Sequence, residues 1–433
     1  MNAPLERLLG LARWERAGMR LGLERIEALL DALDRPEAML RIVHVGGTNG
    51  KGSVSALTAA ILQAAGLRTG LYTSPHLLDV TERVRIDGVA VSREVLARHA
   101  ARIERALDTG VATFFEAMTA VALAVFEEAR VDAAVLEVGL GGRWDATNVG
   151  RALVSVVTRI DYDHQEFLGR RLEDIAGEKA GIIRGGTVLS AAQAPEAMAV
   201  IEARCRAVAV PLRVEGRELM VETRASDLEG HRLDLRGPGF AYGNVRLALP
   251  GLYQPANAVL AVGAVRAFAS ASDLPVSEAA VRAGCAAVRW PGRFQVIPGA
   301  AGRPTLVLDG AHNPGGATAL AVSLRHHFAG RRLALVLGVS ADKDRAGILK
   351  ALAPLAARIY LAPADHPRAT PPQELVGQLP PVDAEVVLTQ GSDEALARVL
   401  GEPGIDVVCV AGSLFLVADA LRWLGARGLV AAV

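Results

Sequence analysis

The sequence predicts an α/β fold in two domains, of which the larger has a mostly parallel sheet with a small antiparallel addition and the second, smaller one is again α/β. Three observations support this fold. Short β-branched segments alternate with apolar segments of helical length, which is typical of parallel sheets covered on both faces. A stretch with closely spaced glycines interrupts the alternation at residues 214–249. A turn signal at Trp290-Pro291-Gly292 precedes a second series of alternating segments.

The elements of the larger domain follow from the spacing of apolar residues. Residues 21–33 have the period of a helix, and Ile42-Val43-His44-Val45 has the composition of a buried strand that enters a glycine loop. Residues 214–249 predict antiparallel hairpins on the edge of the sheet, because glycines separate their short alternating runs. We further expect helices at 53–65, 114–129, 172–183, 255–271 and 277–288, and strands at 69–73, 133–138 and 153–157.

The second domain is predicted from a new alternation of strands and helices. Its strands are expected near residues 305–308, 333–337, 359–361, 385–388 and 407–410. The turn signal before this series places the boundary near Arg289. We therefore predict one domain at residues 1–289 and another at 290–433.

Composition excludes several classes of protein. Hydrophobic residues make up 51% of the chain, which is ample for full cores and argues against disorder. The 47 basic and 47 acidic side chains cancel, whereas a nucleic-acid binder usually carries a basic excess, so we expect no nucleic-acid partner. Cys205, Cys285 and Cys409 are far apart and match neither a metal pattern nor a disulfide framework, which favours buried thiols in a reducing cytoplasm.

The apolar stretches are too short for a membrane protein. Residues 117–126, among the longest, fall well below the roughly 20 residues that cross a bilayer. Charges interrupt the apolar positions of the N-terminal segment, which therefore lacks the apolar core of a signal peptide. We expect a soluble, cytoplasmic protein without a membrane partner, and a monomer.

A glycine-rich loop, Gly46-Gly47-Thr48-Asn49-Gly50-Lys51-Gly52-Ser53, lies between a predicted strand and a predicted helix. There, backbone N–H groups and the positive end of the helix dipole can hold phosphate oxygens, and Lys51 can contact the β and γ phosphates. The pattern differs from the usual P-loop, because Gly52 separates Lys51 from the hydroxyl residue. A glycine turn without a ligand is the alternative. Only four lysines occur among the 47 basic residues, and one of them is Lys51.

Acidic and imidazole side chains follow two of the predicted strands. Glu137 lies near the end of one strand, and Asp161, Asp163 and His164 come after the next. Ligands of open parallel sheets bind beyond the carboxyl ends of the strands, so Glu137 and His164 are expected to face the same crevice as Lys51. Such groups suit Mg²⁺ bound together with substrate phosphates, although a lone glutamate at a strand end is more often solvated.

A series of motifs in the same order resembles the dihydrofolate synthase and folylpolyglutamate synthase family of the Mur ligase superfamily. The series comprises Gly47-Thr-Asn-Gly-Lys-Gly-Ser53, Thr73-Ser-Pro-His-Leu77, Thr81-Glu-Arg-Val84, Phe114-Phe-Glu116, Glu137-Val-Gly-Leu-Gly-Gly-Arg143, Asp145-Ala-Thr-Asn148, Asp163-His164, Glu178-Lys-Ala-Gly181, Pro291-Gly-Arg-Phe-Gln295 and Asp309-Gly-Ala-His-Asn-Pro314. The resemblance implies a P-loop domain and a Rossmann-like second domain. It also implies an ATP-dependent amide ligase that joins L-glutamate to the carboxylate of dihydropteroate, a reduced folate, or both, through an acyl phosphate.

The resemblance also implies roles for individual residues. Lys51, Lys179 and His164 would be catalytic, and Mg²⁺ would be held by Ser74, Glu137, His164 and a carbamate on Lys179. The ATP contacts would be Asn49, Gly50, Lys51, Gly52, Ser53, Asn257, Arg293, Asp309 and His312. The pterin substrate would lie near Thr113, Phe114, Phe115, Glu116, Trp144, Asp145 and Ala146.

Three alternatives accompany this interpretation. A Mur-type ligase acting on a cell-wall precursor and a P-loop nucleotide-hydrolysing switch are the competing functions. Lys179 could instead be a helix-surface lysine paired with Glu178 or Asp174. Trp144 stands where the family commonly has leucine, and Arg20 also departs from expectation, so both bear on the shape of the pterin pocket.

Overall fold

The larger sheet forms the centre of the first domain in the computed structural model, which describes all residues except 1–2, 12–21, 105–111, 300–301 and 431–433. Within the described residues this sheet has the strand order β4-β3-β2-β5-β1-β6-β7-β8. The six strands from β2 to β8 run parallel, and β3 and β4 add an antiparallel edge. The strands are β1 (Ile42–Gly46), β2 (Thr69–Tyr72), β3 (Val84–Ile86), β4 (Val89–Ala90), β5 (Ala133–Glu137), β6 (Ala152–Val157), β7 (Thr187–Ser190) and β8 (Leu212–Val214).

Helices cover both faces of this sheet. Successive side chains of β1 point to opposite faces, so Val43 and Val45 join one core and Ile42 joins another. Helices on the Val43 side are α3 (Lys51–Ala64), α10 (Gln254–Ser272) and α11 (Glu278–Ala287). Those on the opposite side are α1 (Ala3–Leu11), α2 (Glu24–Asp31), α4 (Arg93–Arg102) and α6 (Phe114–Glu128), with α7 (Gln165–Leu168), α8 (Leu172–Lys179) and α9 (Pro195–Ala207) over β6 and β7. Short 3₁₀ turns occur at Pro36–Met39, Val80–Arg83 and Ala180–Ile182.

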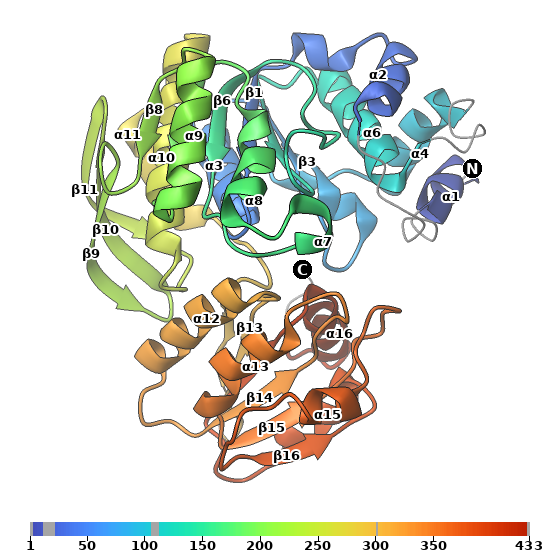
Figure 1. Ribbon diagram of the computed structural model, residues 1–433, viewed down its shortest axis with the longest axis vertical. Coiled ribbons are helices and arrows are strands. Elements are labelled where there is room, and N and C mark those ends of the chain that lie inside the picture. Colours follow the sequence, from blue (N-terminus) through green and yellow to red (C-terminus); the bar gives the residue numbers. More distant parts are fainter. Residues whose placement is uncertain (1–2, 12–21, 105–111, 300–301, 431–433) are drawn as a thin grey trace.

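The antiparallel addition is a separate sheet. Strands β9 (Met220–Asp227), β10 (Gly230–Gly237) and β11 (Phe240–Leu247) pair only with one another among the described residues, in the order β11-β10-β9. Buried side chains of β10 and β11 pack with α10 and α11 in one hydrophobic core. The prediction of hairpins was therefore correct, but their predicted place on the edge of the large sheet was wrong, because their apolar face packs on helices (Figure 1).

The second domain contains its own, mostly parallel sheet. In the described part of the chain its order is β12-β13-β17-β14-β15-β16, and only β12 is antiparallel to its neighbour. The strands are β12 (Gln295–Ile297), β13 (Thr305–Leu308), β14 (Leu333–Leu337), β15 (Arg358–Leu361), β16 (Glu385–Leu388) and β17 (Val407–Ala411). The helices are α12 (Pro314–His327), α13 (Arg345–Leu352), α14 (Pro372–Val376), α15 (Ser392–Val399) and α16 (Leu414–Gly425), with a 3₁₀ turn at Ala353–Leu355.

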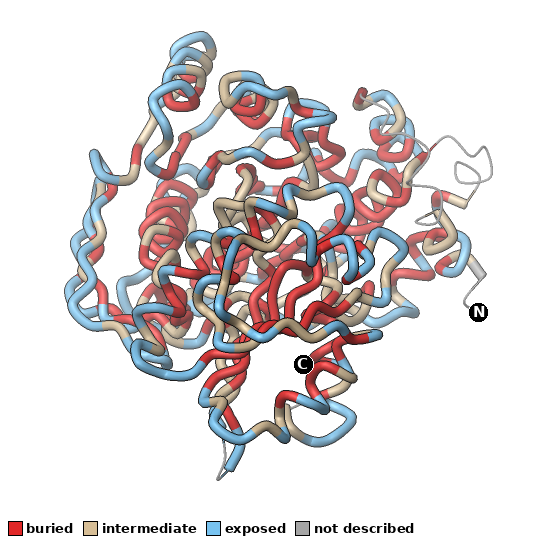
Figure 2. The backbone as a smooth tube through the Cα atoms, turned by 60° about the horizontal axis from the view of Figure 1, so that its bottom comes forward, coloured by how far each residue is buried: buried red, intermediate tan, exposed pale blue. Residues whose placement is uncertain are grey.

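The predicted fold class is confirmed. Buried residues are concentrated in the interior, between the sheets and the helices that cover them (Figure 2). The helix predicted at residues 21–33 corresponds to α2, which is shorter. Residue 21 lies outside the described part of the chain. The helix predicted at 172–183 ends earlier, since α8 passes into a 3₁₀ turn. The division at residues 289 and 290 falls between α11 and β12 and stays a prediction.

Two observations bear on the predicted surroundings of the protein. Cys205, Cys285 and Cys409 are all buried free thiols. No helix in the described ranges has both the length and the apolar character needed to cross a membrane.

Close packing of α11 on α3 depends on Gly284. A Cβ added there would lie 2.5 Å from the Cα of Ile61, a backbone atom that cannot move away cheaply. We expect Gly284→Ala to lower the free energy of unfolding by about 1–3 kcal/mol, measured by urea denaturation. Gly177→Ala is the matched control, because α8 leaves open space within 4 Å of that position. Equal stability of Gly284→Ala and the parent chain would contradict this account.

Candidate active site

The glycine-rich loop joins β1 to α3 and is anchored to the end of β6. Backbone N–H groups of Thr48 and Asn49 donate to the carbonyl oxygen of Arg159 at 2.9 and 3.1 Å. Gly47 has φ of +133°, and a Cβ there would lie 2.0 Å from Thr158 Oγ1, so this close approach requires glycine. The loop ends at the N-terminus of α3, where free N–H groups and the helix dipole favour phosphate.

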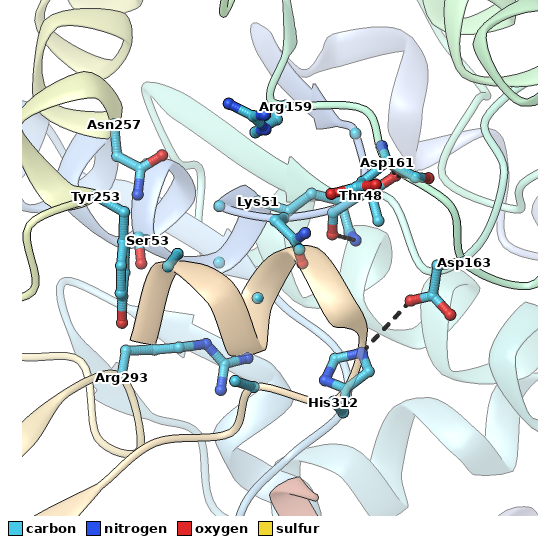
Figure 3. A pocket seen from close by; sticks show the side chains of 18 of the residues that line it. Thr48, Lys51, Ser53, Arg159, Asp161, Asp163, Tyr253, Asn257, Arg293 and His312 are labelled. Atoms are coloured by element: carbon cyan, nitrogen blue, oxygen red, sulfur yellow. Dashed lines mark hydrogen bonds and ion pairs between the residues drawn. The ribbon is translucent and has the colours of Figure 1, made fainter. Parts of the chain in front are cut away.

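A cavity of about 730 Å³ lies at this loop and is lined by both domains. Its size is in the range of pockets that bind nucleotide-sized ligands. In Figure 3, Tyr253, Asn257 and Arg293 lie toward one end, and Asp163 and His312 toward the other, with Lys51 between them. Of the predicted site residues, the cavity is lined by Asn49, Gly50, Lys51, Gly52, Ser53, Ser74, Glu137, His164, Lys179, Asn257, Arg293, Asp309 and His312. The predicted ATP and metal residues are thus brought together.

Lys51 is the first residue of α3 and lines the cavity. Its Nζ donates to the carbonyl oxygen of Thr48 at 3.2 Å. Burial lowers the pKa of Lys51, while the nearby carboxylates of Glu137 and Asp163 favour its charged form. The ammonium group therefore lies beside buried acids that favour its charged form.

Lys179 is buried at the C-terminal end of α8, with 4% of its surface exposed. Its Nζ donates to the carbonyl oxygen of Gly47 in the phosphate loop at 2.9 Å. Burial, together with the charge of Lys51, lowers the pKa of Lys179 to about 7. The alternative of a helix-surface lysine paired with Glu178 or Asp174 is therefore wrong.

Oxygen and imidazole donors suitable for Mg²⁺ line the same cavity. The backbone N–H of Ser74 donates to Glu137 Oε2 at 3.2 Å, which places the Ser74 residue beside that carboxylate. Burial raises the pKa of Glu137, and the charge of Lys51 opposes this shift. Burial lowers the pKa of His164 to about 4, so the imidazole is neutral at pH 7, which is the form in which histidine binds metals.

The donor set fits a metal ion whose remaining ligands come from its substrate and from water. Within the described ranges, no group of three or more His, Cys, Asp or Glu side chains is arranged to hold a metal ion. Glu137 and Ser74 offer the hard oxygen donors that suit Mg²⁺, and His164 adds an imidazole nitrogen; waters and phosphate oxygens usually supply the other ligands of Mg²⁺. The residues present therefore fit Mg²⁺ bound with a nucleotide.

Asp163 contacts residues of the second domain at the end of the cavity where His312 lies. Lys343 Nζ lies 2.6 Å from Asp163 Oδ1 and 3.2 Å from His164 Nε2. Asn313 donates to Asp163 Oδ2 at 3.1 Å and exchanges two hydrogen bonds with Asn49. Burial alone would raise the pKa of Asp163, but a hydrogen bond with His312, the neighbouring His164 and the charge of Lys343 lower it well below its usual range.

The opposite end contains a second bond between the domains. Tyr253, at the start of α10, donates to Asp309 Oδ2 at 2.7 Å. Backbone N–H groups of Phe294 and Ala311 also donate to the Asp309 carboxylate, each at 2.8 Å. Burial raises the pKa of Asp309, and Arg293 opposes the shift.

Asn257 donates to Gln254, which in turn donates to Ser53 Oγ at 3.2 Å.

The residues at the start of α6 that were expected near a pterin do not line the cavity. Thr113 caps α6 in a capping box with Glu116, and Arg25 pairs with Glu116 at 2.8 Å. Phe114 is buried beneath the guanidinium of Arg83, and Phe115 packs against Gly139. Their contact with a pterin stays a prediction.

The second group expected near the pterin lies in the loop after β5. Trp144 is 43% exposed, whereas Asp145 and Ala146 are buried. The Asp145 carboxylate accepts hydrogen bonds from the backbone N–H groups of Leu140 at 2.8 Å and Thr147 at 3.0 Å. Arg20, the other departure from the family pattern, lies outside the described residues.

Sequence reasoning missed several residues of the cavity or its rim. Tyr253, Asn313, Lys343 and Arg159 were not assigned, although the first three bridge the domains. Lys343 had a usable signal, since it is one of only four lysines in the chain. Tyr253 and Arg159 carry no signal of that kind, because their roles arise from segments far apart in the sequence.

Comparison with protein families gives two matches that together span both domains. The Mur ligase middle domain matches residues 45–265, and the Mur ligase glutamate ligase domain matches residues 292–414. The chain is 40% identical over 378 residues to the dihydrofolate synthase/folylpolyglutamate synthase of Mycobacterium tuberculosis, covering 82% of this chain and 77% of that one. It is 33% identical over 415 residues to the protein of the same description from Bacillus subtilis, with 93% and 94% covered.

Solved structures give the same result. Folylpolyglutamate synthase of Mycobacterium tuberculosis complexed with ADP and AMPPCP is similar with a TM-score of 0.89, at 36% identity and with 98% of this chain and 99% of that chain covered. E. coli FolC in complex with DHPP and ADP has a TM-score of 0.88 at 33% identity, with 98% of each chain covered. From these matches and the cavity at the phosphate loop, the chain belongs to the dihydrofolate synthase/folylpolyglutamate synthase family of Mur ligases.

Proposed function

We propose that this protein is an ATP-dependent ligase that joins L-glutamate to the carboxylate of dihydropteroate, a reduced folate, or both. One observation carries the proposal: the phosphate loop, Lys51 and the metal donors Glu137 and His164 line one cavity with Arg293 and Asp309 of the second domain. The relatives named above include proteins described as dihydrofolate synthase/folylpolyglutamate synthase, which favours this reaction over a cell-wall ligase or a nucleotide switch.

The reaction proceeds in two steps. The substrate carboxylate attacks the γ-phosphorus of ATP, which forms an acyl phosphate and releases ADP. The amino group of glutamate then attacks the acyl carbon, loses a proton and expels phosphate to leave an amide. Mg²⁺ supplies charge neutralisation for the phosphate oxygens when it is bound.

This chain's own residues position the reactants. Loop N–H groups and Lys51 hold the phosphates, and Arg293 offers a forked cation to phosphate oxygens. Asp309 lines the cavity from the second domain, and a carboxylate is an acceptor suited to a ribose hydroxyl. Because both domains line the cavity, their approach excludes water from the acyl phosphate.

A substrate panel tests the proposal. Dihydropteroate, tetrahydrofolate and a UDP-linked cell-wall acid are each incubated with Mg-ATP, with and without glutamate, and products are identified by mass. We expect glutamate-dependent ADP release with at least one pterin substrate. ADP release that needs no acceptor would favour the switch, and activity confined to the UDP-linked acid would favour the cell-wall ligase.

That the protein is a cytoplasmic monomer stays a prediction from the sequence. The buried free thiols are compatible with a reducing compartment. Light scattering of the purified protein tests the monomer, and cell fractionation tests the location.

Lys51→Arg tests the phosphate loop. The loop is shaped around a slender ammonium group that reaches back to the Thr48 carbonyl, and the planar guanidinium is bulkier. We expect turnover to fall at least about tenfold, equivalent to roughly 1.4 kcal/mol of transition-state stabilisation. Steady-state kinetics at saturating ATP measure the effect, and near-normal turnover would remove Lys51 from this role.

Glu137→Gln tests the metal site. Glutamine keeps the shape of the side chain and can still accept from Ser74, but it removes the charge that attracts Mg²⁺. We expect the Mg²⁺ concentration for half-maximal activity to rise about tenfold or more. An unchanged Mg²⁺ dependence in a folded variant would place Glu137 outside the metal shell.

Lys179 is proposed to react with CO₂ to form a carbamate that helps to hold Mg²⁺. The neutral amine forms a bond to the CO₂ carbon and releases a proton, and the product supplies anionic oxygens in place of a repelling ammonium. The burial of Lys179 beside the phosphate loop supports the proposal, since a pKa near 7 leaves the amine neutral above that pH. Activation by bicarbonate should therefore grow as pH rises through about 7.

Two variants and one crystal test the carbamate. Lys179→Arg should be severely impaired, because guanidinium stays protonated, and Lys179→Ala should regain some activity with added short carboxylic acids. Near-normal activity of Lys179→Arg would contradict the proposal. So would a bare amine in the electron density of a Mg-nucleotide complex grown with bicarbonate.

A further inference from the structure

His44 is a buried polar residue that the proposed mechanism does not use. It lies in β1, the strand that leads into the phosphate loop, and is 3% exposed. Its neighbours Val43 and Val45 belong to the core that contains α3, α10 and α11, so His44 points to the opposite face of the sheet. A polar ring in this place costs free energy unless it is hydrogen-bonded.

The ring is bonded to a residue of the loop that follows β5. His44 Nε2 lies 2.8 Å from Thr147 Oγ1, and Thr147 Oγ1 lies 2.5 Å from Asp145 Oδ1. Thr147 is fully buried, so its hydroxyl has no contact with bulk water. The three side chains form one buried chain of hydrogen bonds from the central strand to the loop.

The direction of each hydrogen bond follows from the donors available. Both oxygens of Asp145 accept backbone N–H groups, from Leu140 and Thr147, as a carboxylate does. The single proton of the Thr147 hydroxyl is therefore donated to Asp145. Thr147 Oγ1 must then accept from His44, which places the ring proton on Nε2. Burial, aided by the charge of Arg184, lowers the pKa of His44 to about 3, so the ring stays neutral.

The chain ends at the carboxylate that closes the loop. Asp145 binds Leu140 at one end of the loop and Thr147 at the other. Leu140 lines the nucleotide cavity, and Glu137 lies only three residues before it. Arg143 in the same loop donates its backbone N–H to the Glu178 carbonyl at 2.8 Å, next to Lys179. The loop thus connects Glu137 and Lys179, two of the four proposed metal donors, to the exposed Trp144.

We propose that His44 and Thr147 are positioning residues, which act through Asp145 to hold the loop of residues 138–147 in the geometry that binds the carboxylate substrate. Asp145 shapes its own loop through the hydrogen bonds that it accepts from Leu140 and Thr147. This positioning role is distinct from contact with the pterin, near which the family resemblance places Asp145. The inference rests on the proposed function for its kinetic consequences, while the hydrogen-bond chain itself is independent of that function.

A pair of variants at Thr147 separates the hydroxyl from the packing. Thr147→Val keeps the shape and removes the donor to Asp145, whereas Thr147→Ser keeps the hydroxyl and removes a methyl group. We expect Thr147→Val to raise the KM for the pterin substrate or lower kcat by about tenfold, with the Kd for Mg-ADP nearly unchanged. Thr147→Ser should recover most of this loss. Equal kinetics for Thr147→Val and the parent protein would overturn the proposal, as would a loss confined to Mg-ADP binding.

Two measurements on the unliganded protein keep the test independent of turnover. Nitrogen-15 NMR of His44, assigned by comparison with His44→Gln, should show a neutral ring with its proton on Nε2. Hydrogen exchange at the Leu140 amide should be at least about tenfold faster in Thr147→Val than in Thr147→Ser. A proton on Nδ1, or equal exchange in the two variants, would overturn the chain. An inactive parent protein that passed both measurements would instead refute the proposed function.

Discussion

The hydrogen bonds from the phosphate loop to the Arg159 carbonyl oxygen are the constraint on which the rest of the site depends. They hold the N–H groups of Thr48 and Asn49 against the end of β6, and this contact is possible only because Gly47 has no side chain. With the loop fixed there, Lys51 begins α3, and the Gly47 carbonyl faces the amine of Lys179. Two of the chain's four lysines therefore contact this loop through its backbone carbonyl groups.

Buried charges balance one another around this loop. Burial of the charged forms of Lys51 and Lys179 costs free energy. Asp163 offsets part of this cost for both lysines, and Glu137 does so for Lys51. Burial lowers the pKa of Lys179 and raises that of Glu137, and the charge of Lys51 adds to the first shift and opposes the second. A nucleotide and a divalent cation would complete the balance, because they add charge of both signs to the same cavity.

Helix α12 makes the two domains contact each other at both of its ends. At its start, Asn313 exchanges hydrogen bonds with Asn49 of the phosphate loop. Farther along, Ser323 accepts from the backbone N–H of Leu252, and His327 contacts the Pro250 carbonyl oxygen at 3.0 Å. Separation of the domains would break these contacts together with the bond from Tyr253 to Asp309 (Figure 1). The contents of the cavity are therefore coupled to how the domains meet.

The sequence by itself determined the α/β class, the order of the main elements and the residues at the phosphate loop, because hydrophobic period and glycine spacing are local properties. Motif order also predicted which residues gather in the cavity, including Lys179, Arg293 and Asp309. Only the tertiary structure placed β9 to β11 on helices, paired Lys343 with Asp163 and joined His44 to Thr147. The pairs Lys343–Asp163 and His44–Thr147 are 180 and 103 positions apart. The hydrogen-bond partner of a buried polar group depends on which segments fold beside it. The sequence around a buried polar residue therefore does not identify its hydrogen-bond partner.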